Sequence, residues 1–210
     1  MGRLYGQEMV LPSLAVLLGV ISLVAWLSPA DKVLGDLVKL VYVHGAIIQV
    51  ALFVFALAGL LGAAYLVTER AKFFEWSQAL ERTGILLWVL YILTSAVVMT
   101  RAWGGISWGE PRWIFGLQIL VVAPIVHLGG ILIQSRRVSA FLNVAMAGII
   151  VFLLAQAQLI LHPLNPVAAS PNVEIKMSYN LLLTLWALTA LQLARGLRSA
   201  AILRTIPIYR

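Results

Sequence analysis

Residues Trp103 to Trp113 read WGGISWGEPRW, and long apolar segments flank this stretch on both sides. It holds three of the chain's seven tryptophans, together with three glycines, one glutamate, one proline and one arginine. Tryptophan is enriched where apolar segments leave a membrane, and glycine and proline interrupt regular structure. The stretch therefore predicts a short loop at a membrane surface, around which the other segments are arranged.

The composition predicts an all-α integral membrane protein. The chain has 210 residues, of which 62% are hydrophobic and 11% charged, and its mean hydropathy is +0.98. A soluble domain carries about a quarter charged residues. Because a transmembrane helix needs about 20 mostly apolar residues, the length allows six transmembrane helices in a single domain, 1–210.

The apolar segments divide the chain into six expected spans. In residue numbers, these are 11–27, 40–67, 84–99, 113–134, 138–161 and 179–193. The amphipathic connection 31–39 is expected to lie along the membrane surface. The most charged stretch, 68–83, carries three aromatic residues and predicts a separate surface helix. The remaining connections are an outward tryptophan-rich loop at 101–113, an outward loop at 162–178 and a basic cytoplasmic tail at 194–210.

The basic residues predict the orientation. One face of a six-span bundle receives ten of them: Arg3, Arg70, Lys72, Arg82, Arg136, Arg137, Arg195, Arg198, Arg204 and Arg210. The other face receives five: Lys32, Lys39, Arg101, Arg112 and Lys176. Since cytoplasmic loops are richer in lysine and arginine, both termini are expected in the cytoplasm and the protein in the inner (cytoplasmic) membrane. The net charge of +7 then reflects topology and contact with membrane lipid, and no nucleic-acid partner is expected. With no cysteines, the chain has no thiolate metal site or disulfide of its own.

Two of the three histidines are predicted to reach the face that carries the tryptophan loop. His44 begins the second span and His162 ends the fifth. Histidine is the usual protein ligand of haem iron, so one imidazole could approach a haem from each side. The alternative is that each imidazole bonds a backbone carbonyl or reaches the interface. His127 lies about 20 Å deeper along its helix and is expected to be a buried, hydrogen-bonded core residue, with an inner haem site as the minor interpretation.

The loop contains groups that suit a flat, anionic ligand such as haem. Trp103 and Trp108 offer aromatic surface, and Arg112 or Arg101 could hold a propionate through paired hydrogen bonds. Glu110 could pair with Arg112 or orient a histidine. The alternative is that all of them are ordinary interfacial residues. The sequence contains no nucleophile–base pair, phosphate loop or metal motif, so no enzyme activity is expected.

Three features together resemble the haem-handling proteins of cytochrome c maturation, most closely the CcmC type. They are VYVHGAI at 41–47, the loop with its opening WG and closing EPR, and a histidine that ends the next outward span. The related CcmF and CcsA proteins share the tryptophan-rich loop, known as the WWD domain. The loop departs from the family pattern because Glu110 replaces an aspartate and Trp108 is shifted, so the aromatic surface is thinner.

The resemblance implies that His44 and His162 are the axial ligands of a non-covalent haem b. It implies that Trp103 and Gly104 are the opening WG of the motif, and that Glu110 and Arg112 are its acidic and basic residues. It also implies partners, such as an ATP-binding-cassette haem exporter or a haem chaperone. Two other functions stay open. One is a membrane subunit of an electron-transfer or photosynthetic complex with fixed haem or none, and the other is a small transporter.

Overall fold

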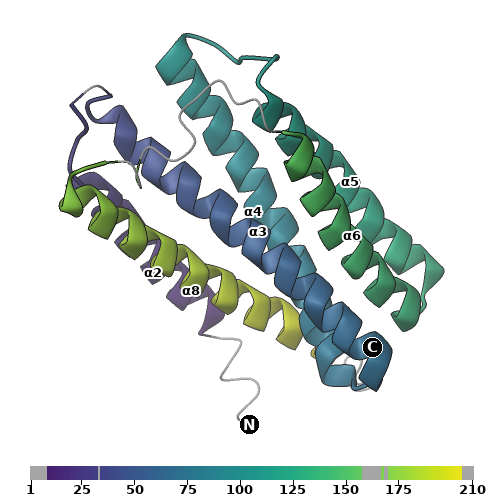
Figure 1. Cartoon of the computed structure of the whole chain (residues 1–210). Coiled ribbons are helices and arrows are strands. Elements are labelled where there is room, and N and C mark those ends of the chain that lie inside the picture. Colours follow the sequence, from purple (N-terminus) through teal and green to yellow (C-terminus); the bar gives the residue numbers. More distant parts are fainter. Residues whose placement is uncertain (1–8, 33, 158–166, 168–169, 205–210) are drawn as a thin grey trace.

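The computed structural model describes residues 9–32, 34–157, 167 and 170–204 (Figure 1). Within these residues there are six α-helices, and each is long and apolar enough to cross a membrane, as predicted. They are α2 (Val10–Leu27), α3 (Leu37–Thr68), α4 (Ala71–Trp103), α5 (Pro111–Ile133), α6 (Arg136–Gln156) and α8 (Val173–Arg204).

The six helices form three neighbouring pairs. α3 and α4 lie in the centre, α5 and α6 cover one side of them, and α2 and α8 cover the other (Figure 1). α2 contacts mainly α8, and only Ile21 on α2 is buried. Its remaining apolar surface suits lipid, because lipid chains replace a protein core around such a helix.

Glycines set the close approach of α3 to α6. A Cβ atom added at Gly62 would lie 2.7 Å from the carbonyl oxygen of Ala140, and one added at Gly59 would lie 2.7 Å from Cβ of Ala147. Small residues at such crossings let two helix backbones approach. The central helix α3 is therefore pressed against both α4 and α6, so polar side chains from three helices can meet inside the bundle.

The prediction of a separate surface helix at 68–83 is wrong. α4 runs without a break from Ala71 to Trp103, and Ser77, Glu81 and Thr83 are buried in its first third. Glu75 lies on one face of the helix, where it pairs with Arg198 of α8 at 2.8 Å. The opposite face packs against α3 and α6. The number of charged residues therefore predicted a surface helix, although one face of the helix is buried.

The amphipathic connection at 31–39 contains a tight turn. Asp31 and Gly35 exchange two backbone hydrogen bonds of 3.2 and 2.9 Å, and Gly35 takes the left-handed conformation with φ +56°. This tight turn leads directly into α3 at Leu37. The side chain of Lys39 reaches back to α2, where its Nζ donates to the carbonyl oxygen of Trp26.

The last helix is longer than predicted. α8 includes residues 173–178 of the expected outward loop and residues 194–204 of the expected tail. Its last turns meet the start of α2, since a Cβ added at Gly196 would lie 2.8 Å from Cγ1 of Val10. Gln192 also donates to the hydroxyl of Ser13 at 2.7 Å. The two ends of the described chain therefore lie at the same end of the bundle as the turn between α3 and α4 (Figure 1).

Candidate functional site

A column of aromatic rings holds His44 in place at the end of the bundle that carries the tryptophan loop. The His44 imidazole on α3 stacks on Tyr91 of α4, with ring centroids 5.0 Å apart and planes 23° apart. Tyr91 packs on Trp88, again at 5.0 Å, and Trp88 meets the edge of Phe115 on α5 at 5.5 Å. The indole Nε1 of Trp88 donates to the carbonyl oxygen of Gly116 at 2.9 Å. The imidazole is thus positioned by rings from two other helices.

The start of α5 lies beside the same column. Glu110 is the N-cap residue of α5, only 3% exposed, and its carboxylate accepts from the backbone N–H of Arg112 at 3.4 Å. Proline at the first helical position supports this start. Gly116, one turn after Arg112, lies against the Tyr91 ring, since a Cβ added there would lie 3.2 Å from Cε1 of Tyr91. The fold therefore brings together His44, Glu110 and Arg112, three of the predicted site residues, around Tyr91, which sequence reasoning did not single out.

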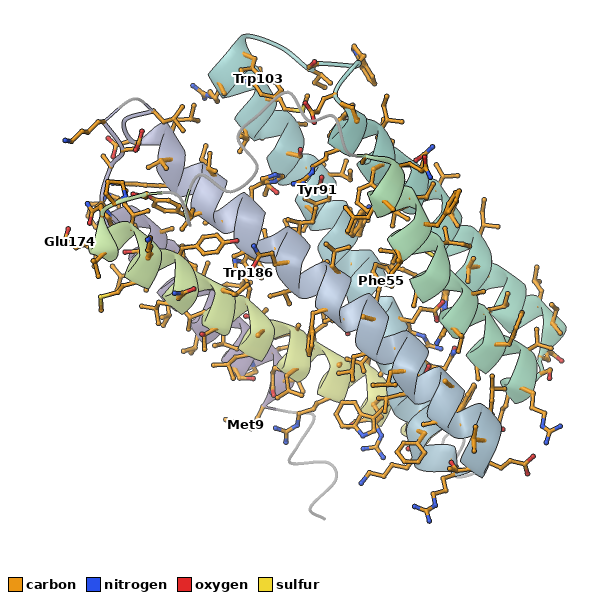
Figure 2. The ribbon with its side chains drawn as sticks, in the orientation of Figure 1. Met9, Phe55, Tyr91, Trp103, Glu174 and Trp186 are labelled. Atoms are coloured by element: carbon orange, nitrogen blue, oxygen red, sulfur yellow. The ribbon has the colours of Figure 1, made fainter. Side chains whose placement is uncertain are left out.

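The tryptophans lie farther out and do not form one flat shelf. Trp103 ends α4 twelve residues beyond Tyr91, a rise of about 18 Å, and Figure 2 shows it near the tip of that helix. Trp108 is 68% exposed and meets the buried Trp113 edge-on, with ring planes 70° apart. The rings of Trp108 and Trp113 therefore do not share one plane.

A hollow occupies the tip of the loop. It is lined by Trp103, Gly104, Gly105, Ile106 and Ser107, and its volume is about 420 Å³. Gly104 ends α4 in the left-handed conformation, φ +77°, which glycine adopts without strain. Ligand sites typically span about 300 to 1,000 Å³, so the hollow is large enough to take part of a ligand that also reaches the loop's inner end.

Two buried donors near the start of α5 fit an anionic group. Nε of Arg112 and Nε1 of Trp113 are both buried and have no hydrogen-bond partner within the described part of the chain. A carboxylate is the natural acceptor for a guanidinium, so a haem propionate fits the charge and donor chemistry here. His162, the second predicted axial ligand, lies outside the described residues.

A second polar group lies at the other end of the bundle. His127 of α5 is hydrogen-bonded, as predicted, with its Nδ1 3.0 Å from Oε2 of Glu81 on α4. Sequence reasoning missed Glu81 because it assigned that residue to a surface helix. The four-residue spacing from Ser77 to Glu81 was the available signal, since it places both polar side chains on one helix face.

No family model matches this sequence, and a search of curated proteins finds no match. The resemblance to the CcmC type stays a prediction, and it rests on the two histidines and the tryptophan loop.

Proposed function

We propose that the chain is a haem-handling protein of cytochrome c maturation in the inner membrane. It holds haem b at the tryptophan-loop end of the bundle and passes it to a partner protein. The observation that carries this proposal is the meeting of His44, Glu110 and Arg112 around Tyr91, from three separate elements. One imidazole, one guanidinium and aromatic rings are the groups that haem requires.

Each residue has a distinct part in this proposal. His44 and His162 would hold the haem iron, and the ring of Tyr91 would keep the His44 imidazole in one orientation. Arg112 binds a propionate. Glu110 caps α5, so it fixes the start of the helix that carries Arg112. Trp103, Gly104 and Trp108 form the outer loop, where haem meets its partner. Haem itself supplies the iron, and the chain contributes binding, orientation and release.

The partner supplies what this chain lacks. The sequence contains no phosphate-binding loop, so energy from ATP would come from an exporter in the same membrane. A haem chaperone on the outer face is the alternative recipient. The glycines at 104, 105 and 109 leave the loop backbone open, because a Cβ added at any of them would meet no atom within 4 Å. Such a loop has room to close against a partner.

The absorption spectrum of the purified protein tests the proposal. We expect six-coordinate low-spin haem in the wild type and a change toward five-coordinate high-spin haem, or haem loss, in His44→Ala and in His162→Ala. Added imidazole should restore the low-spin form, because it can occupy the vacated position. His127→Ala is the control and should leave the spectrum unchanged. A wild-type protein that binds no haem when reconstituted would contradict the proposal.

The orientation of the tryptophans favours one rival function. Because Trp108 and Trp113 meet edge-on and Trp113 is buried, the loop offers less flat surface for presenting haem to a partner. A membrane subunit of an electron-transfer complex, with fixed haem or none, needs no such surface. Transfer to apo-myoglobin distinguishes the two: a handler loses haem to this acceptor within minutes to hours, whereas a redox subunit retains it.

A further inference from the structure

A carboxylate is buried inside the apolar bundle, far from the proposed haem site. Glu81 is only 2% exposed and lies about 15 Å along α4 from Ala71. Its partner His127 lies about 9 Å from the end of α5, a helix about 35 Å long. Both residues lie within about 10 Å of the midpoint of their helix, so a hydrocarbon core about 30 Å thick that is centred on these helices includes both side chains. Ionisable groups at such depth are costly and mark functional sites by default.

Polar side chains from three helices surround this carboxylate. Oε2 of Glu81 lies 3.0 Å from Nδ1 of His127. With the amide nitrogen of Asn143 on α6 facing Glu81, it donates to Oε1 at 3.1 Å and to Oε2 at 3.3 Å. The amide oxygen of Asn143 then accepts from Nε2 of Gln78 at 3.1 Å and from the hydroxyl of Ser77 at 2.8 Å. This arrangement satisfies an ionised carboxylate.

The same atoms also satisfy a protonated carboxyl group. If the Asn143 and Gln78 amides turn over together, the Asn143 nitrogen donates to the hydroxyl of Ser77 at 2.8 Å, and that hydroxyl donates to the carbonyl oxygen of Ala58 at 2.8 Å. Gln78 must turn as well, because its amide nitrogen would otherwise face the amide nitrogen of Asn143. The amide oxygen then faces Glu81, where only a protonated carboxyl can donate to it. Amides and hydroxyls both donate and accept, so the cluster accommodates Glu81 in either protonation state.

Glu69 and Glu75 pair with other residues, whereas Nε of Arg82 is buried without a hydrogen-bond partner among the described residues. Glu75 of α4 pairs with Arg198 of α8, and Glu69, after α3, pairs with Arg137 of α6. Two further arginines lie on α4 and α6. Arg82 directly follows Glu81 and so points about 100° away around α4, and Arg136 lies over the ring of Phe74. Tyr65 of α3 packs on that same ring. A proton gained or lost by the cluster therefore changes the charge of Glu81 and His127 themselves.

A cavity lies beside this cluster and borders Gln78. Its volume is about 200 Å³, and its lining includes Gln78, Gly130, Gln134, Arg136 and Ser139. One water molecule takes about 30 Å³ of liquid volume, so the cavity has room for several. Gln78 belongs both to the cavity wall and to the hydrogen-bonded cluster, so water in the cavity reaches the polar network at this residue.

We propose that Glu81 and His127 form a proton-binding site inside the membrane, loaded and unloaded through the cavity beside Gln78. A proton from cavity water forms an O–H bond with the Glu81 carboxylate, and the Asn143 amide turns over to accept from it. Release breaks that O–H bond, returns the proton to water and restores the first orientation. The site is independent of haem and goes beyond the proposed haem function.

Infrared difference spectroscopy of the protein in lipid nanodiscs tests the site. On titration from alkaline to acidic buffer, we expect a C=O stretching band of a protonated buried carboxyl group that shifts in D₂O. Glu81→Gln should abolish the band while preserving the side chain's shape. Glu75→Gln is the matched control on the same helix and should retain the band. If the wild type shows no such band, or if the band survives in Glu81→Gln, the pair is a static structural contact and the proposal is wrong.

A second variant tests the route. Gln78→Leu removes the amide between cavity and cluster, so we expect the carboxyl band to persist but its hydrogen–deuterium exchange to slow severalfold. Gln118→Leu, at an exposed position on α5, should exchange at the wild-type rate. Thermal unfolding followed by circular dichroism confirms that each variant is folded. Unchanged exchange in Gln78→Leu would overturn the proposed route, because protons would then reach Glu81 another way.

Discussion

Tyr91 is the residue on which the candidate haem site is built. Its ring contacts His44 and Trp88, and a Cβ added at Gly116 would come within 3.2 Å of it. Because Gly116 has no side chain, α5 approaches α4 closely enough for Arg112 to lie near the column of aromatic rings. A single aromatic side chain therefore relates the histidine on α3 to the arginine at the start of α5.

The first prediction concerns this ring. Tyr91→Phe retains the stacked ring and should leave haem binding and spectrum unchanged. Tyr91→Leu removes the stacking surface, and because aromatic pairs contribute about 0.5–1.5 kcal/mol beyond their buried area, haem affinity should fall by about two- to tenfold. Haem titration of the purified apoprotein measures both. Equal losses in the two variants would instead assign the effect to the hydroxyl group.

The second prediction concerns Arg112. If its guanidinium binds a propionate, Arg112→Leu should reduce haem affinity by about tenfold or more, since a charge-assisted hydrogen bond contributes about 1.5–3 kcal/mol. The spectrum of the remaining haem should be unchanged because the axial ligands are untouched. Arg101→Leu, in the last turn of α4, is the control and should retain haem. If Arg112→Leu retained haem as well as the wild type does, Arg112 would serve only as an interfacial anchor.

At the scale of the helix, α4 shows how a charged sequence becomes a buried element. Its first third carries Glu75, Glu81 and Arg82, yet the helix continues unbroken through them. Glu75 is neutralised by Arg198 of α8, while Glu81 is enclosed by His127 and Asn143. Hydropathy averaged along the chain cannot distinguish the face of α4 that carries Glu75 from the face that carries Glu81. The packing of α4 against α3, α6 and α8 distinguishes them.

The third prediction concerns the contact between α3 and α6. Gly62→Ala places a Cβ atom 2.7 Å from the carbonyl oxygen of Ala140, so the helices must move apart. Overpacking of this kind costs about 1–3 kcal/mol, and the thermal unfolding midpoint in detergent should fall. The matched control is Gly148→Ala on α6, where a Cβ would meet no atom within 4 Å. A midpoint that stays at the wild-type value in Gly62→Ala would show that this crossing is looser than described.

At the scale of the whole molecule, the basic residues gather at one end of the bundle. Arg70 and Lys72 lie at the turn between α3 and α4, Arg136 and Arg137 begin α6, and Arg198 lies near the end of α8. The proposed haem site lies at the opposite end, and the Glu81–His127 pair lies between them, nearer the basic end. The orientation of the bundle therefore decides which compartment each site faces.

The fourth prediction is that orientation. Because cytoplasmic segments are rich in lysine and arginine, a reporter fused after Arg210 should be active only in the cytoplasm. A reporter inserted after Leu164 should be active only outside. Alkaline phosphatase and green fluorescent protein provide the complementary readouts at both positions. A C-terminus that reports from outside would place the proposed haem site on the cytoplasmic face and would contradict the proposed export-side function.

The sequence by itself determined the helical membrane class and the number of apolar spans, because length and hydropathy are properties of each segment alone. It also indicated the hydrogen bond of His127, since a deep imidazole needs a partner. Only the tertiary structure decided which partner, because Glu81 and Asn143 come from other helices and lie 46 and 16 residues away in sequence. It likewise decided that Tyr91, rather than the tryptophans, contacts His44. Which side chains meet depends on how the helices cross and rotate, and those angles are set by contacts such as Gly62 against Ala140, which segment hydropathy does not contain.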